Sequence, residues 1–481
     1  MDSAVTVIVL AAGAGTRMRS SKAKVLHELG GRSLLGHALA AARAAEPDTV
    51  VVVVGHQRDQ VSEHALAFDA DVRIAIQAEQ RGTGHAVQMA LQGLDDRHGT
   101  VVVTSGDVPL LAAETLTALV ADQSAGGHAV SLLSAELPDP SGYGRVLRDD
   151  SGAVTAIREH RDASPDELSI KEVNAGSYAF DAHFLATALE QVGTSNAQGE
   201  VYLTDVIALA VGQGRTVSAV VCADVWQTEG VNDRVQLARL GAELNRRTLE
   251  RWMRAGVTVV DPASTFVDVT VKLAPDVTLL PGTQLHGSTT VREGAGIGPD
   301  TTLIDTVVGP DATVVRTHGT GAELGPGVVV GPFAYLRPGT RVSEGGKVGT
   351  FVETKNALLG PNAKVPHLSY VGDAEVGEGA NIGAGTIFAN YDGVEKHRTV
   401  VGRHCKTGSD NVFVAPVTIG DGAVTGAGTV VRRNVPPGAL AVSASTQRHL
   451  EGWVARKRPD SPAAKAAAAA DDDADPEASG R

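Results

Sequence analysis

The first residues suited to chemistry follow a strand-like run, residues 5–10, near the N-terminus. The sequence LAAGAGTRM at residues 10–18 contains Arg17, and Lys24 comes six residues after Met18. Small residues after a buried strand let backbone N–H groups approach a polyphosphate, and the two cations supply charge. The run lacks the G-K-[ST] of a Walker A loop and the third glycine of a dinucleotide loop. It predicts a nucleoside triphosphate site, with an ordinary glycine-rich strand–helix turn as the alternative.

An aspartate closes a second strand-like run. Asp107 follows residues 100–104, and the sequence EGVND at residues 229–233 contains Asn232. Carboxylate and amide oxygens suit Mg²⁺, which would then lie against triphosphate oxygens. The alternative for Asp107 is a structural role in a turn or at a helix N-terminus. Taken alone, Asn232 is no better than an even candidate for a second metal ligand.

Polar loops supply candidates for base and sugar recognition. The sequence QAEQRGTGH at residues 77–85 is a polar turn before a helix, whose amides suit a base edge. Taken alone, it reads as a capped loop. Donors and acceptors that suit sugar hydroxyls occur at Gly144, Glu159 and Asn174, each of them a weak signal by itself.

These motifs occur in the order seen in bacterial N-acetylglucosamine-1-phosphate uridyltransferases, which the N-terminal half resembles. The resemblance implies attack of a sugar-1-phosphate oxygen on the α-phosphorus of UTP, with Arg17 and Lys24 catalytic and with Asp107 and Asn232 holding Mg²⁺. The family usually has proline before the lysine, so Ala23 predicts a less rigid loop. The residues that the resemblance assigns to UTP or UDP-N-acetylglucosamine are Leu10, Ala11, Ala12, Gly13, Lys24, Gln77, Gly82, Thr83, Gly144, Glu159, Asn174 and Asn232.

The C-terminal half has a second set of polar and bulky residues, interrupting a regular pattern. Arg337, Lys355, Tyr370 and Asn381 suit an anionic sugar phosphate. An amine must be neutral to attack a thioester, and histidine is the natural base near neutral pH. His367 is the candidate, although an isolated histidine is more often a hydrogen-bonded structural residue.

The motifs HLSYVGDAE (residues 367–375), NIGAGT (residues 381–386) and NYDG (residues 390–393) resemble the acetyltransferase domain of the same bifunctional family, a left-handed parallel β-helix. The resemblance makes His367 the general base, and Glu353 a residue that orients a partner group. It assigns glucosamine-1-phosphate to Arg337, Lys355, Tyr370 and Asn381, and acetyl-CoA to Ala384, Asn390, Tyr391, Ser409 and Ala427.

One departure from the family affects the acetyl-CoA site. The family often has arginine where this chain has Ala444, which offers no cation. Trp453 could stack on adenine, beside a basic cluster that is the candidate replacement, with a solvated tail as the alternative. The cluster consists of Arg448, Arg456, Lys457 and Arg458.

The elements that must position these residues form four regions. Residues 1–230 alternate strand and helix patterns, which predicts a doubly wound, Rossmann-like α/β nucleotidyltransferase domain. Residues 231–255 read as an amphipathic linker helix, and residues 459–481 as a disordered tail. Aliphatic residues recur every six positions across residues 256–458, which predicts a β-helix of hexapeptide repeats and on the order of ten coils.

Composition excludes several classes of protein. The chain has 481 residues, a net charge of −14 and two cysteines, which argues against nucleic-acid binding and a disulfide framework. No signal peptide is visible and no apolar run approaches ~20 residues, so we expect a cytoplasmic protein without membrane insertion.

We expect a bifunctional enzyme acting on small molecules: acetyl-CoA and glucosamine-1-phosphate give N-acetylglucosamine-1-phosphate, which UTP converts to UDP-N-acetylglucosamine for cell-envelope synthesis. The resemblance also implies a homotrimer with acetyl-transfer sites at subunit boundaries. The alternatives are a nucleotidyltransferase, such as one making ADP-glucose, with a non-catalytic β-helix, and an inactive scaffold subunit.

Overall fold

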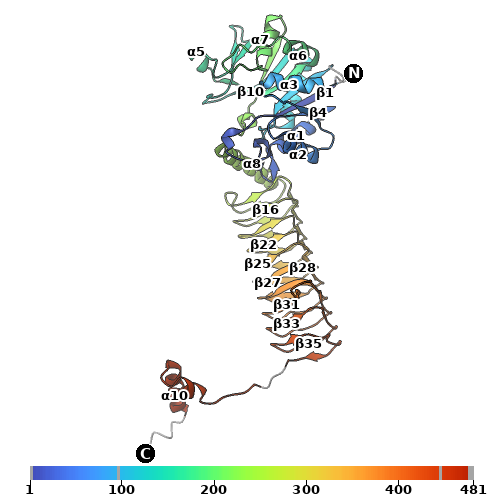
Figure 1. Cartoon of the computed structure of the whole chain (residues 1–481), viewed down its shortest axis with the longest axis vertical. Helices are drawn as coiled ribbons and strands as arrows, with labels where there is room; N and C mark the ends of the chain where they lie inside the picture. The colour runs from blue at the N-terminus through green and yellow to red at the C-terminus, as the bar shows by residue number, and fades with distance from the viewer. Residues whose placement is uncertain (1–3, 95–97, 444–446, 475–481) are drawn as a thin grey trace, which may run out of the picture.

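The molecule is elongated, with a globular head above a long β-helix (Figure 1). The computed structural model describes residues 4–94, 98–443 and 447–474, with backbone only for 471–474. Helix α8 (Arg234–Arg254) lies between head and β-helix, and two short helices follow the last coil. In these ranges no helix is long and apolar enough to cross a bilayer.

The head is built on one twisted sheet with strand order β11-β7-β10-β6-β1-β4-β5. All neighbours in this order are parallel except β10, which runs antiparallel to β6 and β7. A hairpin of β8 (Arg145–Arg148) and β9 (Val154–Arg158) extends from β10. The strands are β1 (Val5–Ala11), β4 (Thr49–Val54), β5 (Arg73–Ile76), β6 (Thr100–Ser105), β7 (Val130–Glu136), β10 (Glu172–Asp181) and β11 (Val217–Val221).

Helices cover both faces of this sheet because its central strands are apolar on both sides. Val7 and Val9 pack with α1, α2 and α4, whereas Ile8 packs with α3, α6 and α7. This confirms the predicted doubly wound α/β domain. The helices are α1 (Leu34–Ala44), α2 (Arg58–Phe68), α3 (Thr83–Gln92), α4 (Ala113–Gly126), α5 (Pro165–Leu168), α6 (Ala182–Leu189) and α7 (Asp205–Gly212).

The linker helix α8 joins the two cores. Its cap residue Asp233 accepts hydrogen bonds from the N–H groups of Val235 and Gln236. Leu240 belongs to a core cluster of the head, and Leu249 belongs to the core of the β-helix. Beside it, the hairpin of β2 (Glu28–Leu29) and β3 (Arg32–Ser33) touches the first coil through the N–H of Val269, which donates to the carbonyl of Gly30 at 2.9 Å.

The β-helix confirms the six-residue period. Its strands pair in parallel with a partner one coil away, as in the register Phe266↔Gln284, three hexads apart, and aliphatic residues at the repeating positions form one continuous core. One sheet contains β12 (Thr258–Val259), β15 (Thr278–Leu279), β18 (Gly296–Ile297), β21 (Thr313–Val314), β24 (Val329–Val330), β27 (Lys347–Thr350) and β29 (Lys364–His367). The larger sheet contains β13 (Phe266–Val267), β14 (Lys272–Leu273), β16 (Gln284–His286), β17 (Thr290–Val291), β19 (Thr302–Ile304), β20 (Val307–Val308), β22 (Thr317–Thr320), β23 (Glu323–Leu324), β25 (Ala334–Leu336), β26 (Arg341–Val342), β28 (Glu353–Leu359), β30 (Tyr370–Val376), β31 (Ile387–Ala389), β32 (Thr399–Val401), β33 (Val412–Val414), β34 (Val417–Ile419) and β36 (Val430–Val431), and a short pair is formed by β35 (Val424–Thr425) and β37 (Leu440–Ala441).

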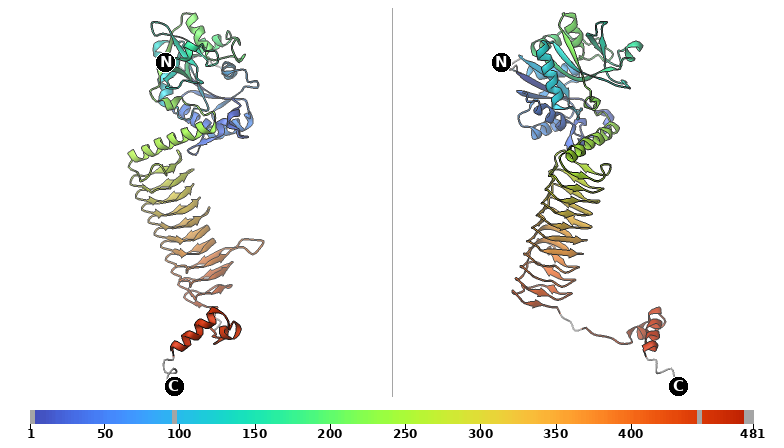
Figure 2. Two further views of the ribbon diagram at one scale, coloured as in Figure 1. Left: turned by 90° about the vertical axis from the view of Figure 1, so that its left-hand side faces the viewer. Right: turned by 180° about the vertical axis from the view of Figure 1, so that it is seen from behind.

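An inserted loop interrupts this regular register. Tyr370 pairs with Ile387, but Ile387 pairs with Val412, so one coil is longer than its neighbour. The extra residues form a loop between β31 and β32, which projects from the side of the β-helix (Figure 2).

The C-terminal segment differs from the predicted disordered tail. Helices α9 (Trp453–Lys457) and α10 (Pro462–Ala474) follow the last coil. Alanine has the highest helix propensity, so the alanine-rich run is helical although it lacks large apolar residues. Residues 475–481 lie outside the described part of the chain.

Candidate functional sites

The head contains a cavity of about 280 Å³ at the carboxyl ends of its parallel strands. The loops after β1 and β6 meet there because these strands are parallel neighbours. Nine residues predicted from the sequence line it: Leu10, Ala11, Ala12, Gly13, Lys24, Gln77, Gly82, Thr83 and Asp107.

Three glycines shape this cavity in different ways. A Cβ on Gly13 would meet nothing within 4 Å, so this position leaves room for a ligand. Gly82 has φ +103°, and a Cβ there would lie 2.5 Å from the carbonyl oxygen of Val201. A Cβ on Gly15 would lie 2.5 Å from the Cβ of Lys24, so Gly15 makes space for the lysine stem. The glycine loop therefore positions a cation as well as admitting a ligand.

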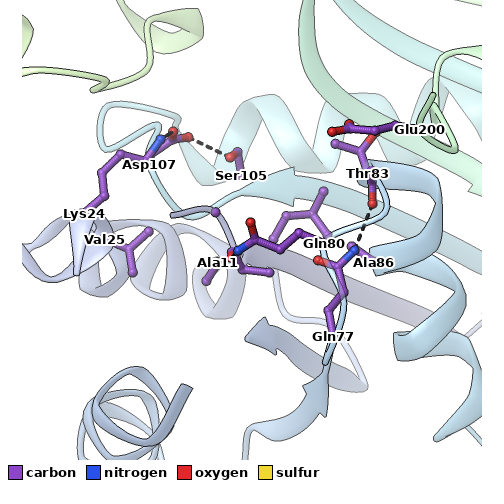
Figure 3. A pocket seen from close by; sticks show the side chains of 14 residues that line it. Ala11, Lys24, Val25, Gln77, Gln80, Thr83, Ala86, Ser105, Asp107 and Glu200 are labelled. Atoms are coloured by element: carbon purple, nitrogen blue, oxygen red, sulfur yellow. Dashed lines mark hydrogen bonds and ion pairs between the residues drawn. The ribbon is translucent and has the colours of Figure 1, made fainter. Parts of the chain in front are cut away.

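Two glutamine side chains, Gln77 and Gln80, line the part of the cavity away from Lys24 and Asp107 (Figure 3). Buried Gln77 donates from Nε2 to the carbonyl oxygen of Gly82 at 3.0 Å. Gln80, the second amide of the predicted polar turn, donates to the carbonyl oxygen of Ala12 at 2.6 Å. Glu200 also lines the cavity, and no local motif marks it.

The candidate phosphate and metal residues are paired with each other. Lys24 Nζ forms an ion pair with Asp107 Oδ2, and Arg17 Nη2 donates to Asn232 Oδ1 at 2.8 Å. Ser105 Oγ donates to the other carboxylate oxygen of Asp107 at 2.6 Å (Figure 3). This serine is a further residue that the sequence analysis did not assign.

The donor set fits Mg²⁺. The N–H of Val231 donates to the backbone carbonyl of Asp107 at 2.9 Å, which holds the segment of Asn232 beside the aspartate. One carboxylate and one amide oxygen are hard ligands, and Mg²⁺ characteristically completes its coordination with water and phosphate oxygens. No group of three or more His, Cys, Asp or Glu that could hold a metal occurs within the described ranges.

The three predicted sugar contacts come together at the hairpin of β8 and β9. Asn174 N–H donates to the carbonyl oxygen of Gly144 at 2.9 Å, and a Cβ on Gly144 would lie 3.5 Å from Glu159 Oε2. Thr204 Oγ1 donates to Glu159 Oε1 at 3.1 Å, while burial raises the pKa of this carboxyl. These residues do not belong to the lining of the 280 Å³ cavity.

Three of the candidate sugar-phosphate residues of the β-helix, Arg337, Lys355 and Tyr370, lie on successive coils of one face. Glu353 pairs with Tyr370, and Lys355 with Gly372, while the Arg337 N–H donates to the carbonyl oxygen of Thr354. Arg337 and Lys355 are therefore on adjacent coils. Arg337 forms an ion pair with Glu353 at 2.9 Å.

A third cation, Lys396, joins this face from the inserted loop. The ammonium of Lys396 lies beside Lys355 and lowers its pKa, with partial desolvation adding to the effect. Asp373 is the counter-charge, and its carboxylate also accepts from Asn356 and Asn390. Sequence spacing did not indicate Lys396, because the loop returns to this face only in the tertiary structure.

A ladder of small residues runs down the corner below His367. The N–H of Gly385 donates to the carbonyl of His367 and that of Asp410 to the carbonyl of Ala384. The N–H of Gly428 then donates to the carbonyl of Ser409, one coil further on. His367, Ala384, Ser409 and Ala427 thus occupy equivalent positions, and the last three have small side chains. The His367 side chain is exposed.

Bulky residues occupy the same corner above His367. Phe333 and Phe351 stack with ring centroids 5.3 Å apart, and Leu368 follows on the next coil. Their exposed fractions are 52%, 58% and 60%. Along this corner, the coils up to His367 therefore carry exposed apolar side chains, and the coils after His367 carry small ones.

Three other predicted residues, Asn381, Tyr391 and Asn390, lie outside the row of Arg337 and Lys355. Asn381 lies on the neighbouring sheet, bridged to Lys364 and Lys406. Tyr391 is 59% exposed in the inserted loop and donates to the carbonyl of Gly393 at 2.7 Å. Buried Asn390 lies 3.4 Å from the Tyr370 hydroxyl.

The predicted replacement for the family arginine is separated from this face. Ala444 lies outside the described residues. The Arg458 guanidinium lies 5.4 Å from the centroid of the Trp453 ring, at the end of α9. Figure 1 shows the C-terminal helical segment, labelled at α10, beyond the last coil. The structure of one chain does not bring this cluster to the ladder.

Comparison with known proteins covers nearly the whole chain. Residues 7–164 match the MobA-like NTP transferase domain, and residues 398–433 match the bacterial transferase hexapeptide with six repeats. The bifunctional protein GlmU of Paenarthrobacter aurescens is 60% identical over 467 residues, covering 96% of this chain and 94% of the relative. The GlmU proteins of Corynebacterium efficiens and Streptomyces coelicolor are each 56% identical, covering 98% of this chain and 97% and 98% of their own lengths. Full-length similarity at this level shows that the chain belongs to the family of bifunctional GlmU proteins.

Proposed function

We propose that the two sites carry the two reactions of the GlmU family: acetyl transfer to glucosamine-1-phosphate on the β-helix, then uridylyl transfer in the head. The observation that carries this proposal is the convergence of eight predicted nucleotide residues and the predicted metal ligand Asp107 on one cavity. The second site rests on the stacking of cations, His367 and the small-residue ladder on consecutive coils.

In the head, Leu10, Ala12, Gln77 and Gly82 would hold uridine against the strand ends. Arg17 and Lys24 would neutralise charge on the triphosphate as pyrophosphate leaves, which is catalysis by positioning and electrostatics. Glu159, beside Gly144 and Asn174, would take the hydroxyl groups of the sugar.

Asp107 and Asn232 would hold Mg²⁺. When bound, this ion stabilises negative charge on phosphoryl oxygens. Asp107 is oriented by Ser105, and Asn232 by the backbone hydrogen bond between Val231 and Asp107.

On the β-helix, His367 would take the proton from the amine of glucosamine-1-phosphate as the amine attacks the thioester carbon of acetyl-CoA. Arg337 and Lys355 would bind the phosphate, with Tyr370 and Asn381 at the sugar. The ladder of Ala384, Ser409 and Ala427 leaves space for the pantetheine arm, with Asn390 and Tyr391 at its border.

We further infer that the chain forms a homotrimer in which a neighbour covers the corner of Phe333, Phe351 and Leu368. Exposed apolar side chains in line along one edge favour association. A neighbour seated there would wall in His367, which is exposed in one chain. Because UTP and acetyl-CoA are cytoplasmic metabolites, we place both reactions in the cytoplasm.

Two variants test the assignment of one reaction to each site. His367→Ala is expected to lower acetyl transfer by about 10²–10⁴-fold, the range for general-base loss, and to leave uridylyl transfer intact. Asp107→Ala is expected to abolish uridylyl transfer and leave acetyl transfer intact. Thiol release from acetyl-CoA and pyrophosphate release from UTP measure the two reactions separately. If His367→Ala retains full acetyl transfer, the β-helix assignment is wrong.

A further inference from the structure

In the candidate nucleotide site, each candidate metal ligand is paired with a candidate phosphate cation. Lys24 is paired with Asp107, and Arg17 is bonded to Asn232. The partners are 83 and 215 residues apart in the sequence, so both contacts are made by the fold. Two independent pairs with the same arrangement indicate a common role.

The lysine pair is well shielded from water. The side chains of Lys24 and Asp107 are only 13% and 16% exposed, so their attraction is little weakened by solvent. Asp107 has its other oxygen bonded to Ser105. A cation arriving from solution therefore meets a carboxylate whose charge is already balanced and whose two oxygens are both in use.

The arginine pair has the same consequence for the second ligand. Arg17 donates to the side-chain oxygen of Asn232, which is the atom that a metal would need. The backbone N–H of Asn232 donates to Gln236 Oε1 at 2.7 Å, which anchors this residue at the start of the linker helix. The amide oxygen becomes free only if the guanidinium moves to another acceptor.

We propose that Lys24 and Arg17 act as internal counter-cations that hold Asp107 and Asn232 closed to a divalent cation until a triphosphate arrives. A metal ion alone must displace two tethered cations and leave them without an anion. A triphosphate supplies oxygens that accept both cations, so the ligands become free as the cations find new partners. This inference rests on the proposed function for the identity of the metal and phosphate residues.

The local structure allows such an exchange of partners. Gly15 leaves space against the stem of Lys24, and Lys24 and Asp107 both line the cavity that the triphosphate would enter. Arg17 lies in the exposed one-turn helix η1 (Thr16–Met18) on the same loop. Both side chains are long enough to turn toward the cavity without a change in the sheet.

The test is metal binding by the full-length protein without nucleotide. Mn²⁺ is titrated as the probe, with free ion followed by electron paramagnetic resonance, against the wild type, Lys24→Met, Arg17→Met and the double variant. Each single variant is expected to bind Mn²⁺ about tenfold more tightly than the wild type, and the double variant more tightly still. Unchanged or weaker binding in both single variants would overturn the proposal.

A matched control distinguishes the loss of a direct contact with a metal ligand from a change in the net charge of the protein. Lys22→Met removes a lysine two positions away whose partner is Glu28, not a metal ligand. This variant is expected to bind Mn²⁺ as the wild type does, and an equal tightening would overturn the proposal, because it would report net charge alone. Asp107→Asn in the Lys24→Met background is expected to remove the tightening, which locates the bound ion. Circular dichroism melting confirms that each variant is folded.

Failure of this inference and failure of the proposed function give different results. If wild-type protein forms UDP-N-acetylglucosamine while Mn²⁺ binding is unaffected by Lys24→Met and Arg17→Met, the counter-cation proposal alone is wrong. If no nucleotide sugar forms, the proposed function is wrong whatever the Mn²⁺ titration shows.

Discussion

The two sites of this chain differ in how much of each is built by one molecule. The head assembles its cavity from separate segments of a single chain, and in it Lys24 is already paired with Asp107 and Arg17 with Asn232. The β-helix presents its histidine, cations and small-residue ladder on an open face.

The architecture explains this difference. A doubly wound sheet directs several loops to one edge, so residues distant in sequence surround a ligand. A β-helix stacks equivalent positions along straight edges, which gives alignment but no enclosing wall. A second chain is the natural source of that wall. The comparison therefore predicts that the two activities respond differently to changes at the subunit surface, in the glycine loop and in pH.

Breaking the exposed aromatic stack is expected to give the largest effect. Phe351 has φ +55°, a conformation that aspartate tolerates well, so Phe351→Asp should fold normally. It places a charge on the apolar corner and should separate the subunits. We expect acetyl transfer to fall by about 100-fold or more while uridylyl transfer is retained. Analytical ultracentrifugation and the two assays measure this. Phe351→Leu is the control, and a monomeric variant with full acetyl transfer would refute the shared-site model.

The glycine loop should affect the other site alone. Gly15→Ala introduces a Cβ 2.5 Å from that of Lys24 and displaces the cation. Because small misplacements of a catalytic group are costly, we expect kcat/KM for uridylyl transfer to fall by about 100-fold, with acetyl transfer unchanged. Gly127→Ala is a matched control, since Gly127 has φ +61° and open space around it. Equal losses in both variants would show that backbone strain, not Lys24, is responsible.

Acid should destabilise the head before the β-helix. Burial lowers the pKa of His37 to about 4, so the folded head resists its protonation, while the unfolded chain takes up a proton near pH 6.5. This stabilising contribution is complete above pH 6.5 and is lost as pH falls toward 4, by up to about 3 kcal/mol. From Thr283 to Thr429, the buried polar residues of the described coils are Thr, Ser and Asn, which do not titrate.

Calorimetry between pH 7 and pH 4.5 checks this expectation. The transition of the head should move to lower temperature while that of the β-helix stays, and His37→Gln should flatten the dependence. Parallel shifts of both transitions would contradict the assignment to His37.

The smallest expected effect concerns the residue before Lys24. Ala23 has φ −55°, within the range of proline, so Ala23→Pro should raise the free energy of unfolding of the head by about 0.4–1 kcal/mol. Uridylyl transfer should be unchanged, because the loop that carries Lys24 already has this conformation. Thermal melting measures the gain, and a lower midpoint would show that proline is not accommodated here.

Much of the candidate sites could be predicted from local sequence. The loop at residues 10–18, Gln77, Asp107 and His367 lie in compact motifs whose residue types indicate their chemistry. Lys396, Glu200 and Ser105 were missed because they reach the sites through loops or as neighbours of a stronger signal. The predicted disordered tail contains a helix in the structure, since alanine content alone favours helix formation.

By itself, the sequence determined the order of the domains, the six-residue period of the β-helix and the candidate groups for phosphate, base and thioester chemistry. Periodicity and short motifs are local properties, and each can be recognised within a few turns or strands. The tertiary structure alone decided that Lys24 pairs with Asp107, that Arg17 pairs with Asn232, and that bulky side chains above His367 give way to small ones below it. Such contacts join residues far apart in the chain, and their partners are chosen by how strands and coils stack in space.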